Sequence, residues 1–433
     1  MSESSSQSAK SRKRLTKQII IGMIAGALTG FLINQYGNLR GEDAVYEFLM
    51  AAGPNGLFEI LGQGFISLLQ VLVVPLVFVS LICGTAALDD IRRLGKIGLK
   101  TVGLYLLTTA IAITLALTAA LIVRPGVGLD RSTDESYTAA EAPSLVEVIV
   151  NIFPRNVIDA MASGNMLQII LFSVLLGIAL SLSGEAGSRL LKLFQDANDV
   201  IMKLVMLIML IAPYGVFALL ARTFADLGLD GILPLAKYFF LVLGVLILHG
   251  MVTYPALLTV LAQLNPRRFM KKMQQVQVFA FSTASSNATI PVTLHAVEHR
   301  LGVKNSVASF TVPLGATINM DGTAIMQGVA TAFIAQAYGI PLGVSDYLVV
   351  ILTATLASIG TAGVPGVGMI MLSMVLLQVG LPVEGIALII GIDRLLDMVR
   401  TAVNVTGDAT VTAIVAKGEG ALDEAVFNAR EED

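Results

Sequence analysis

The chain has 433 residues, of which 55% are hydrophobic and 14% are charged, and its mean hydropathy is +0.80. A soluble protein of this length carries about 25% charged residues, so much of this surface is expected to face lipid. The formal net charge of −3 indicates no nucleic-acid partner. The single cysteine excludes a disulfide framework. The histidines lack the spacing of a metal site and are expected to have structural or surface roles, at His249, His295 and His299.

Apolar runs long enough to cross a bilayer as helices recur along the first 264 residues. They are predicted near 16–36, 57–88, 97–124, 166–183, 199–222 and 234–264. The first run continues without a cleavage site and is interpreted as a retained span rather than a signal peptide. Basic residues at 10–17 and 92–100 alternate with the acidic, lysine-free segment 129–144. This sidedness predicts an inner (plasma) membrane protein with cytoplasmic termini.

Two later apolar stretches are interrupted by small polar residues and proline, at 282–291 and 358–366. Irregular backbone is tolerated at membrane depth only inside protein or beside a water-filled cavity. Each break is therefore predicted to be the tip of a re-entrant helical hairpin. An apolar segment with a polar motif follows each hairpin, at 319–323 and 404–408, so the unit is repeated. The alternative, ordinary surface loops between four or more spans, is disfavoured because the tips carry no charge.

The last predicted helix carries a polar stripe. Its members recur every three or four residues and share one helical face: Asp393, Asp397, Arg400, Asn404 and Asp408. A charge at the centre of a membrane helix costs about 2.5–3.5 kcal/mol, so this face is predicted to be buried in protein. A purely structural Asp397–Arg400 ion pair is the alternative, and it would leave Asp321 and Asp408 without matching bases.

The chemistry of these groups indicates an acidic amino acid and a cation. Asp321 and Asp408 lie beside asparagine and glycine, in sequences predicted to unwind the helix and free carbonyl oxygens for a monovalent cation. Arg400 offers a planar fork for a carboxylate, and Asp397 can accept an ammonium group. Helix N-termini at the hairpin tips favour a second carboxylate.

At these residues the chain resembles the dicarboxylate/amino acid:cation symporter family, which includes glutamate transporters and archaeal sodium–aspartate symporters. The motifs at 319–323, 360–366 and 397–408 carry the resemblance, which extends over essentially the whole chain. It implies an all-α polytopic membrane protein with eight transmembrane helices, two re-entrant hairpins and inverted repeats. It also implies a homotrimer that works as an elevator-type transporter, in which a transport domain slides along a scaffold.

The resemblance divides the chain as follows. The first half comprises a cytoplasmic N-terminal tail (1–15), scaffold helices 1 and 2 (16–96), helix 3 of the transport domain (97–124), and an extracellular loop with scaffold helices 4 and 5 (125–222). The second half comprises helix 6 of the transport domain (234–264), re-entrant hairpin 1 (267–303), helix 7 (304–338), re-entrant hairpin 2 as the gate (345–380), helix 8 (382–417) and a cytoplasmic C-terminal tail (418–433).

The resemblance also implies the binding residues. Substrate contacts are expected from Ser286, Met320, Thr323, Val364, Gly368, Asp397, Arg400, Thr401 and Asn404. One sodium ion is expected at Gly315, Asn319, Asn404 and Asp408, and a second at Thr317, Ser358, Ile359 and Thr361. A third is expected at Tyr105, Thr108, Thr109, Asn319 and Asp321. No catalytic residue and no organic cofactor are expected.

Within the family, Asp408 favours sodium because proton-coupled bacterial members tend to carry asparagine there. Asp397 favours an amino acid because members that carry C4 dicarboxylates lack this acid. The chain departs from many sodium-coupled members at Ala284 and Met398, where they place a second arginine. This departure leaves the coupling details, including any potassium counter-transport, open.

The sequence therefore predicts sodium-coupled uptake of L-aspartate or L-glutamate. A proton-coupled glutamate or C4-dicarboxylate symporter is the alternative within the class. An ion channel is a further alternative, which gradient-driven accumulation would separate from a transporter. An intramembrane enzyme is disfavoured because the sequence shows no nucleophile–base pair, metal-ligand cluster or phosphate loop.

Overall fold

The computed structural model describes residues 17–19, 21–36, 44–50, 56–86, 96–129, 153–227, 232–358, 361, 363 and 366–429. Within these ranges the regular structure is helical, apart from an isolated antiparallel bridge between Val303 and Leu422. The predicted all-α class is therefore confirmed. The predicted N-terminal tail at 1–15 and most of the predicted extracellular loop, at 130–152, lie outside the described residues.

Four helices in the described part of the chain are long and apolar enough to cross a membrane. They are Lys17–Tyr36, Leu57–Cys83, Ile97–Val123 and Leu233–Ala262. A bent pair, Gly184–Met209 with Ala212–Ala225, brings the number to five if it counts as one span. Three shorter apolar helices accompany them: Gln168–Leu182, Val344–Ser358 and Val367–Gln378. The protein is polytopic.

The helices of the first half are α2 (Ala44–Met50), α3 (Leu57–Ala86), α5 (Lys96–Val123), α7 (Val157–Ser163), α8 (Met166–Leu182), α9 (Gly184–Met209) and α10 (Ala212–Leu227). The predicted span at 199–222 includes the junction of α9 and α10, which meet at a bend of 50°. Pro213 explains the bend, since its nitrogen has no hydrogen to donate back to the preceding turn, and proline is tolerated at the start of a new helix.

The helices of the second half carry both hairpins and the polar stripe. They are α11 (Ile232–Leu248), the π-helical turn η3 (His249–Thr253), α12 (Tyr254–Leu257), the π-helical turn η4 (Leu258–Ala262), α13 (Pro266–Thr283), α14 (Ser286–His295), the π-helical turn η5 (Ala296–Arg300), α15 (Asn305–Ile318), α16 (Asp321–Ala337), α17 (Val344–Ser358), α18 (Val367–Gln378), the 3₁₀ turn η6 (Val383–Gly385), α19 (Ile386–Gly418) and α20 (Glu424–Asn428).

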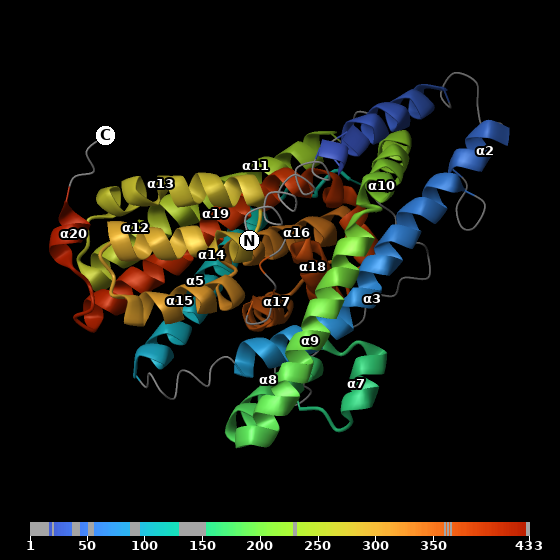
Figure 1. The fold of residues 1–433 in the computed structure, drawn as a ribbon. Coiled ribbons are helices and arrows are strands. Elements are labelled where there is room, and N and C mark those ends of the chain that lie inside the picture. Colours follow the sequence, from blue (N-terminus) through green and yellow to red (C-terminus); the bar gives the residue numbers. More distant parts are fainter. Residues whose placement is uncertain are drawn as a thin grey trace.

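Two groups of helices lie side by side in Figure 1. The N-terminal helix, α3 and α10 form one side, and α3 packs against α8, α9 and α10. On the other side, α19 packs against α11, α13, α15 and α16, and α16 packs against α5. Nearly every residue of α16 is buried, so the core of the molecule follows α16 and α19.

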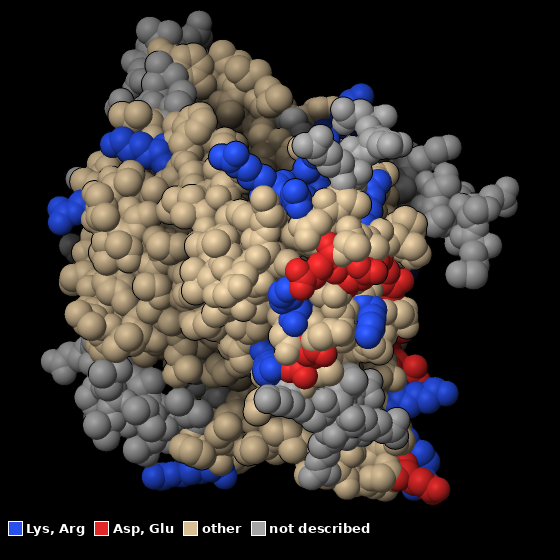
Figure 2. Space-filling view, turned by 90° about the vertical axis from the view of Figure 1, so that its left-hand side faces the viewer, with Lys and Arg blue, Asp and Glu red and all other residues tan. Residues whose placement is uncertain are grey.

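The surface is largely apolar, as expected for contact with lipid. Most of the face in Figure 2 carries no charge, and its Lys, Arg, Asp and Glu side chains lie mainly on the right-hand half and around the edges. Large apolar side chains are exposed on several helices, among them Leu99, Phe240, Val260 and Val278.

In the structure, each predicted break is a short segment between the end of one helix and the start of the next. Helix α13 ends at Thr283, Ala284 adopts a left-handed conformation (φ 48°), and Ser285 caps α14 through a hydrogen bond from the N–H of Ala288. In the second hairpin, α17 ends at Ser358 and α18 begins at Val367, directly after Gly366 with φ 87°. Residues at both segments line the cavity that is described below.

The predicted unwinding of the helix is confirmed at one position and wrong at the other. Helix α15 ends at Ile318 and α16 begins at Asp321, so the backbone is non-helical at Asn319 and Met320. By contrast, α19 runs without interruption through Asp408. Gly407 lies within this intact helix, where a Cβ would lie 2.4 Å from Tyr254 Oη and 2.5 Å from Asn319 Nδ2. This glycine permits close packing rather than unwinding.

The described part of the predicted C-terminal tail packs against the end of the first hairpin. The N–H of Lys304 donates to the carbonyl oxygen of Ala421 at 2.9 Å, and the N–H of Asp423 donates to that of Gly302 at 2.7 Å. The segment that includes α20 is therefore hydrogen-bonded to the chain just after η5.

Candidate functional site

The polar stripe of α19 is buried, as predicted. Asp393, Asp397, Arg400, Asn404 and Asp408 are each exposed by 9% or less. Helix α16 covers this stripe closely, since a Cβ at Gly322 would lie 2.6 Å from the carbonyl oxygen of Arg400. Charged groups therefore lie in the interior of a protein whose outer surface is apolar.

Arg400 is the centre of a charged cluster. Its Nη2 donates to Asp397 Oδ1 at 2.8 Å and to Asp393 Oδ2 at 3.1 Å. Arg394, which lies off the predicted stripe, also reaches Asp397, with 3.3 Å between its Nη1 and Oδ2. The Arg400 side chain nevertheless keeps two buried nitrogens, Nε and Nη1, that have no hydrogen-bond partner among the described residues. Because buried donors left unpaired are costly, these two nitrogens indicate a place for a ligand.

A cavity of about 270 Å³ lies next to this cluster. It is lined by Ala284, Ser286, Met320, Thr323, Thr361, Gly363, Gly368, Asp397, Thr401 and Asn404. Seven of the nine predicted substrate contacts are in this set. Arg400 lies directly behind it, because a Cβ at Gly368 would be 3.1 Å from Arg400 Nη1. The remaining predicted contact, Val364, lies outside the described residues.

The tips of the two hairpins meet at this cavity. Ser285 Oγ donates to the carbonyl oxygen of Gly363 at 2.7 Å, and the N–H of Asn287 donates to the same oxygen at 3.1 Å. The first turn of α14, at Ser286, borders the cavity. The N–H groups of Asn287 and Ala288 are engaged by Gly363 and Ser285, so this helix start favours an anionic ligand mainly through the helix dipole. One helix start therefore borders this space, and one guanidinium lies directly behind Gly368 of its lining.

A second cluster of buried oxygen atoms lies between α5, α15, α16 and α19. Asp408 Oδ1 accepts a hydrogen bond from Asn319 Nδ2 at 2.9 Å, and Thr108 Oγ1 donates to Asn319 Oδ1 at 3.2 Å. A Cβ at Gly315 would lie 2.6 Å from Asp408 Oδ1 and 2.7 Å from Tyr105 Oη. The structure thus brings the first and third predicted sodium sets together around Asn319.

Three side chains contact the carboxylate of Asp321, which belongs to the same cluster. Thr109 Oγ1 donates to its Oδ1 at 2.6 Å, and Tyr254 Oη donates to its Oδ2 at 2.8 Å. Nε2 of His249 lies 3.2 Å from the same Oδ2. All four side chains are fully buried. Carboxylate, hydroxyl and carbonyl oxygens are the ligands that hard cations prefer. The oxygen atoms gathered around Asn319 and Asp321 therefore fit a cation such as sodium.

In the second predicted sodium set, the described hydroxyl groups each donate to a nearby backbone carbonyl oxygen. Thr361 Oγ1 donates to the carbonyl oxygen of Ala357, and Thr317 Oγ1 donates to that of Leu314, each at 2.8 Å. Ser358 Oγ likewise donates to the carbonyl oxygen of Thr355. Ile359 lies outside the described residues. Hairpin 2 approaches α15 at Ala316, whose carbonyl oxygen would lie 3.0 Å from a Cβ at Gly363.

Sequence reasoning missed two residues of the cation cluster, His249 and Tyr254. The structural or surface role expected for the histidines fits His295 and His299, which are exposed and stack on each other. It misses the contact of His249 with Asp321. The signal was present in the sequence, because an ionisable side chain inside a predicted membrane span indicates a functional site by default.

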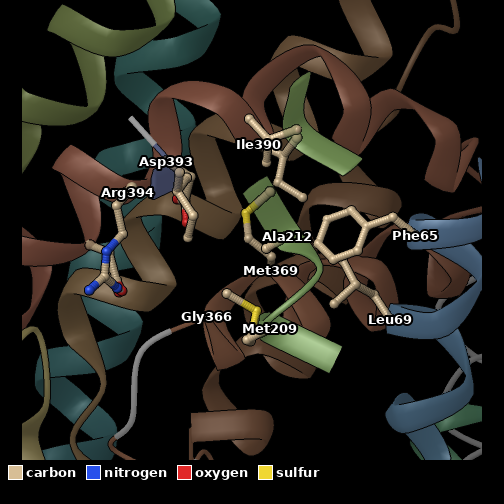
Figure 3. A pocket seen from close by; sticks show the side chains of 12 residues that line it. Phe65, Leu69, Met209, Ala212, Gly366, Met369, Ile390, Asp393 and Arg394 are labelled. Carbon is tan, nitrogen blue, oxygen red and sulfur yellow. The ribbon is translucent and has the colours of Figure 1, made fainter. Parts of the chain in front are cut away.

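An apolar cavity of about 420 Å³ separates the charged cluster from the neighbouring group of helices. Figure 3 shows Asp393 and Arg394 on one side, with Phe65 and Leu69 of α3 opposite them. The residues that line the cavity between them are Met209, Ala212, Gly366, Met369 and Ile390. The lining of this cavity is therefore apolar, apart from Asp393, Arg394 and Asp397.

An all-helical membrane protein with two hairpin tips meeting at a buried, charged cavity belongs to the class of secondary transporters. The model of the sodium:dicarboxylate symporter family matches residues 15–418. The chain is 35% identical over 419 residues to the proton/sodium-glutamate symport protein of Geobacillus stearothermophilus, covering 95% of this chain and 96% of that one. It is 35% identical over 426 residues to the proton/glutamate-aspartate symporter of Escherichia coli (strain K12), covering 94% of each.

A third relative carries a different substrate name. The C4-dicarboxylate transport protein of Bacillus subtilis (strain 168) is 32% identical over 424 residues, covering 95% of each chain. The protein belongs to the sodium:dicarboxylate symporter family. The resemblance identified from the sequence is confirmed, and this family consists of transporters rather than enzymes. The chain is a symporter of acidic amino acids or dicarboxylates in a membrane.

Proposed function

We propose that the protein couples the inward movement of sodium to the uptake of L-aspartate or L-glutamate. The observation that carries this proposal is the pair of nitrogens on buried Arg400 that have no hydrogen-bond partner among the described residues, next to the cavity at the hairpin tips. A carboxylate is the natural partner of two guanidinium donors, because its two oxygens match their geometry. The side-chain carboxylate of the substrate takes this place.

The position of Asp397 supports an amino acid, rather than a dicarboxylate without an amino group, as the substrate. It lines the same cavity as Thr401 and Asn404, and it can accept the substrate's ammonium group. A C4 dicarboxylate would instead bring a second negative charge towards this acid without an ammonium to offset it. The start of α14 at Ser286 is the proposed site for the α-carboxylate. Met320, Thr323, Val364 and Gly368 complete the proposed contacts.

The oxygen cluster around Asn319 supports sodium coupling. Asp321 and Asp408 are buried carboxylates, and a bound cation would offset their charge. The proposed ligands are Tyr105, Thr108, Thr109, Gly315, Asn319, Asp321, Asn404 and Asp408, with a separate set at Thr317, Ser358, Ile359 and Thr361. Asn404 connects the two sites, because it lines the substrate cavity while its carbonyl oxygen accepts a hydrogen bond from Asn319 at 3.3 Å.

The proposed mechanism is an elevator. The helices around α16 and α19 move as one transport domain against the scaffold that includes α3 and α10, with the bounds predicted from the sequence. The mostly apolar lining of the cavity in Figure 3 supports such a movement, because apolar contacts are non-directional. Hairpin 2 is the proposed gate. A homotrimer in the inner membrane, with both termini in the cytoplasm, completes the proposal.

Uptake into proteoliposomes tests the coupling ion. An inward sodium gradient is expected to drive accumulation of labelled aspartate, and a proton gradient in sodium-free buffer is expected to drive none. Equal accumulation in the two conditions would refute sodium coupling. It would favour the proton-coupled alternative, which the name of the Escherichia coli relative supports.

Competition tests the substrate. Unlabelled aspartate and glutamate are expected to displace the label at far lower concentrations than succinate. Succinate that competes as well as aspartate would favour the C4-dicarboxylate alternative, which the name of the Bacillus subtilis relative supports.

A further inference from the structure

We propose that His249 is a positioning residue for the sodium-binding carboxylate of Asp321, and that the π-helical turn η3 places His249 beside Tyr254 so that both contact this carboxylate. The inference rests on the proposed sodium coupling and deepens it. It concerns two residues outside the expected sodium sets, located on the helical segment that precedes the first hairpin.

The backbone of η3 brings the two side chains to one face. The N–H of Tyr254 donates to the carbonyl oxygen of His249, five residues earlier, as in a π-turn. In an α-helix, residues five apart point in directions about 140° apart, since each residue turns by about 100°. The wider π-turn makes His249 and Tyr254 neighbours, and their rings meet edge to face with centroids 4.6 Å apart. Such turns are frequent at functional sites.

The chemistry of the contact fixes the direction of both hydrogen bonds. The oxygens of an ionised carboxylate are acceptors only, so the Tyr254 hydroxyl and the His249 Nε2–H both donate to Asp321 Oδ2. The other ring nitrogen of His249, Nδ1, is buried without a hydrogen-bond partner among the described residues. The His249 ring therefore has a single polar contact in the described structure, and that contact is with Asp321.

These two donors decide which oxygen of Asp321 faces the cation. They occupy Oδ2, while Oδ1 turns towards Thr109 on α5, beside Thr108 and Tyr105. Groups that hydrogen-bond to a metal-binding side chain orient it, and their loss typically lowers metal affinity by about 10–100-fold. Loss of either donor is expected to free the Asp321 carboxylate to rotate away from the cation.

The test measures the sodium concentration that gives half-maximal aspartate binding to the purified full-length protein. His249→Leu and Tyr254→Phe are each expected to raise this concentration by about tenfold or more. Aspartate affinity at saturating sodium is expected to stay unchanged, because neither residue lines the substrate cavity. His249→Gln, which keeps an N–H donor, is expected to recover part of the loss. His299→Leu is the matched control, since His299 is exposed in another π-turn.

A merely structural role for His249 would lower yield or thermal stability without changing the half-saturating sodium concentration. That result, obtained for His249→Leu and Tyr254→Phe together, would overturn the inference and leave sodium coupling intact. Absence of any sodium dependence in the wild type would instead overturn the proposed function. If His249→Leu fails to fold, Tyr254→Phe decides the outcome, because it removes a single oxygen atom. Both donors act on one oxygen atom of Asp321. The double variant is therefore expected to raise the half-saturating sodium concentration by less than the product of the two single increases.

Discussion

Replacing Arg400 tests the substrate site most directly, provided that the charges left behind are balanced. Arg400→Ala alone would leave Asp393 buried without its partner, and breaking a buried pair in this way costs about 3–5 kcal/mol of stability. The double variant Asp393→Asn/Arg400→Ala removes one charge of each sign. Asp397 then keeps Arg394 as its partner. This design separates loss of binding from loss of folding.

The expected effect follows from the two nitrogens of Arg400 that have no hydrogen-bond partner in the described part of the chain. A hydrogen bond to a charged group contributes about 1.5–3 kcal/mol, so two such bonds to the substrate carboxylate contribute about 3–6 kcal/mol together. Each 1.4 kcal/mol or so corresponds to a tenfold change in affinity. The double variant is therefore expected to bind aspartate at least about 100-fold more weakly. Serine, which has no side-chain carboxylate, is expected to lose little.

Calorimetric titration of the purified protein at saturating sodium measures both affinities. Asp393→Asn is the matched control, because it leaves Arg400 and its free donors in place. A melting temperature close to that of the wild type establishes that the double variant is folded. If such a folded variant bound aspartate within about tenfold of the wild-type Kd, Arg400 would not hold the substrate carboxylate.

Three further outcomes are expected. Asp397→Asn should weaken aspartate binding and improve competition by succinate, because the acceptor of the ammonium becomes neutral; an unchanged order of competitors would contradict this role. Asp408→Asn should raise the sodium concentration needed for half-maximal uptake by about tenfold or more, since a charged ligand is lost; an unchanged value would remove Asp408 from the cation site. Gly407→Ala should lower the melting temperature, because the added Cβ would lie 2.4 Å from Tyr254 Oη, whereas Gly244→Ala, with open space around it, should not. Equal melting temperatures for the two glycine variants would show that the packing at Gly407 is not tight.

Much of the architecture and much of the cavity lining could be predicted from the sequence, because they depend on local patterns. The apolar runs indicated the membrane helices, and the small polar residues at 282–291 indicated the first hairpin tip. The three-to-four-residue spacing of charges placed the stripe of α19 on one buried face. These features follow from helical periodicity and from the cost of exposing polar groups to lipid, which act within a short segment.

Only the tertiary structure decided what each of these groups contacts. Asn, Gly and Asp occur together at both 319–323 and 404–408, yet only α15–α16 breaks, whereas Gly407 packs against Tyr254 and Asn319 within an intact helix. The pairing of Arg400 with both Asp393 and Asp397 also depends on packing, as do its two nitrogens that have no partner among the described residues.

The cation cluster depends on contacts between residues far apart in the chain. His249 and Asp321 are separated by 72 residues, and a π-turn that periodicity does not reveal brings Tyr254 to the same carboxylate. The sequence by itself determined which elements form and which face of the last helix is polar. The fold decided which polar atoms meet and which remain free for a ligand, because those contacts join helices whose relative placement no local pattern encodes.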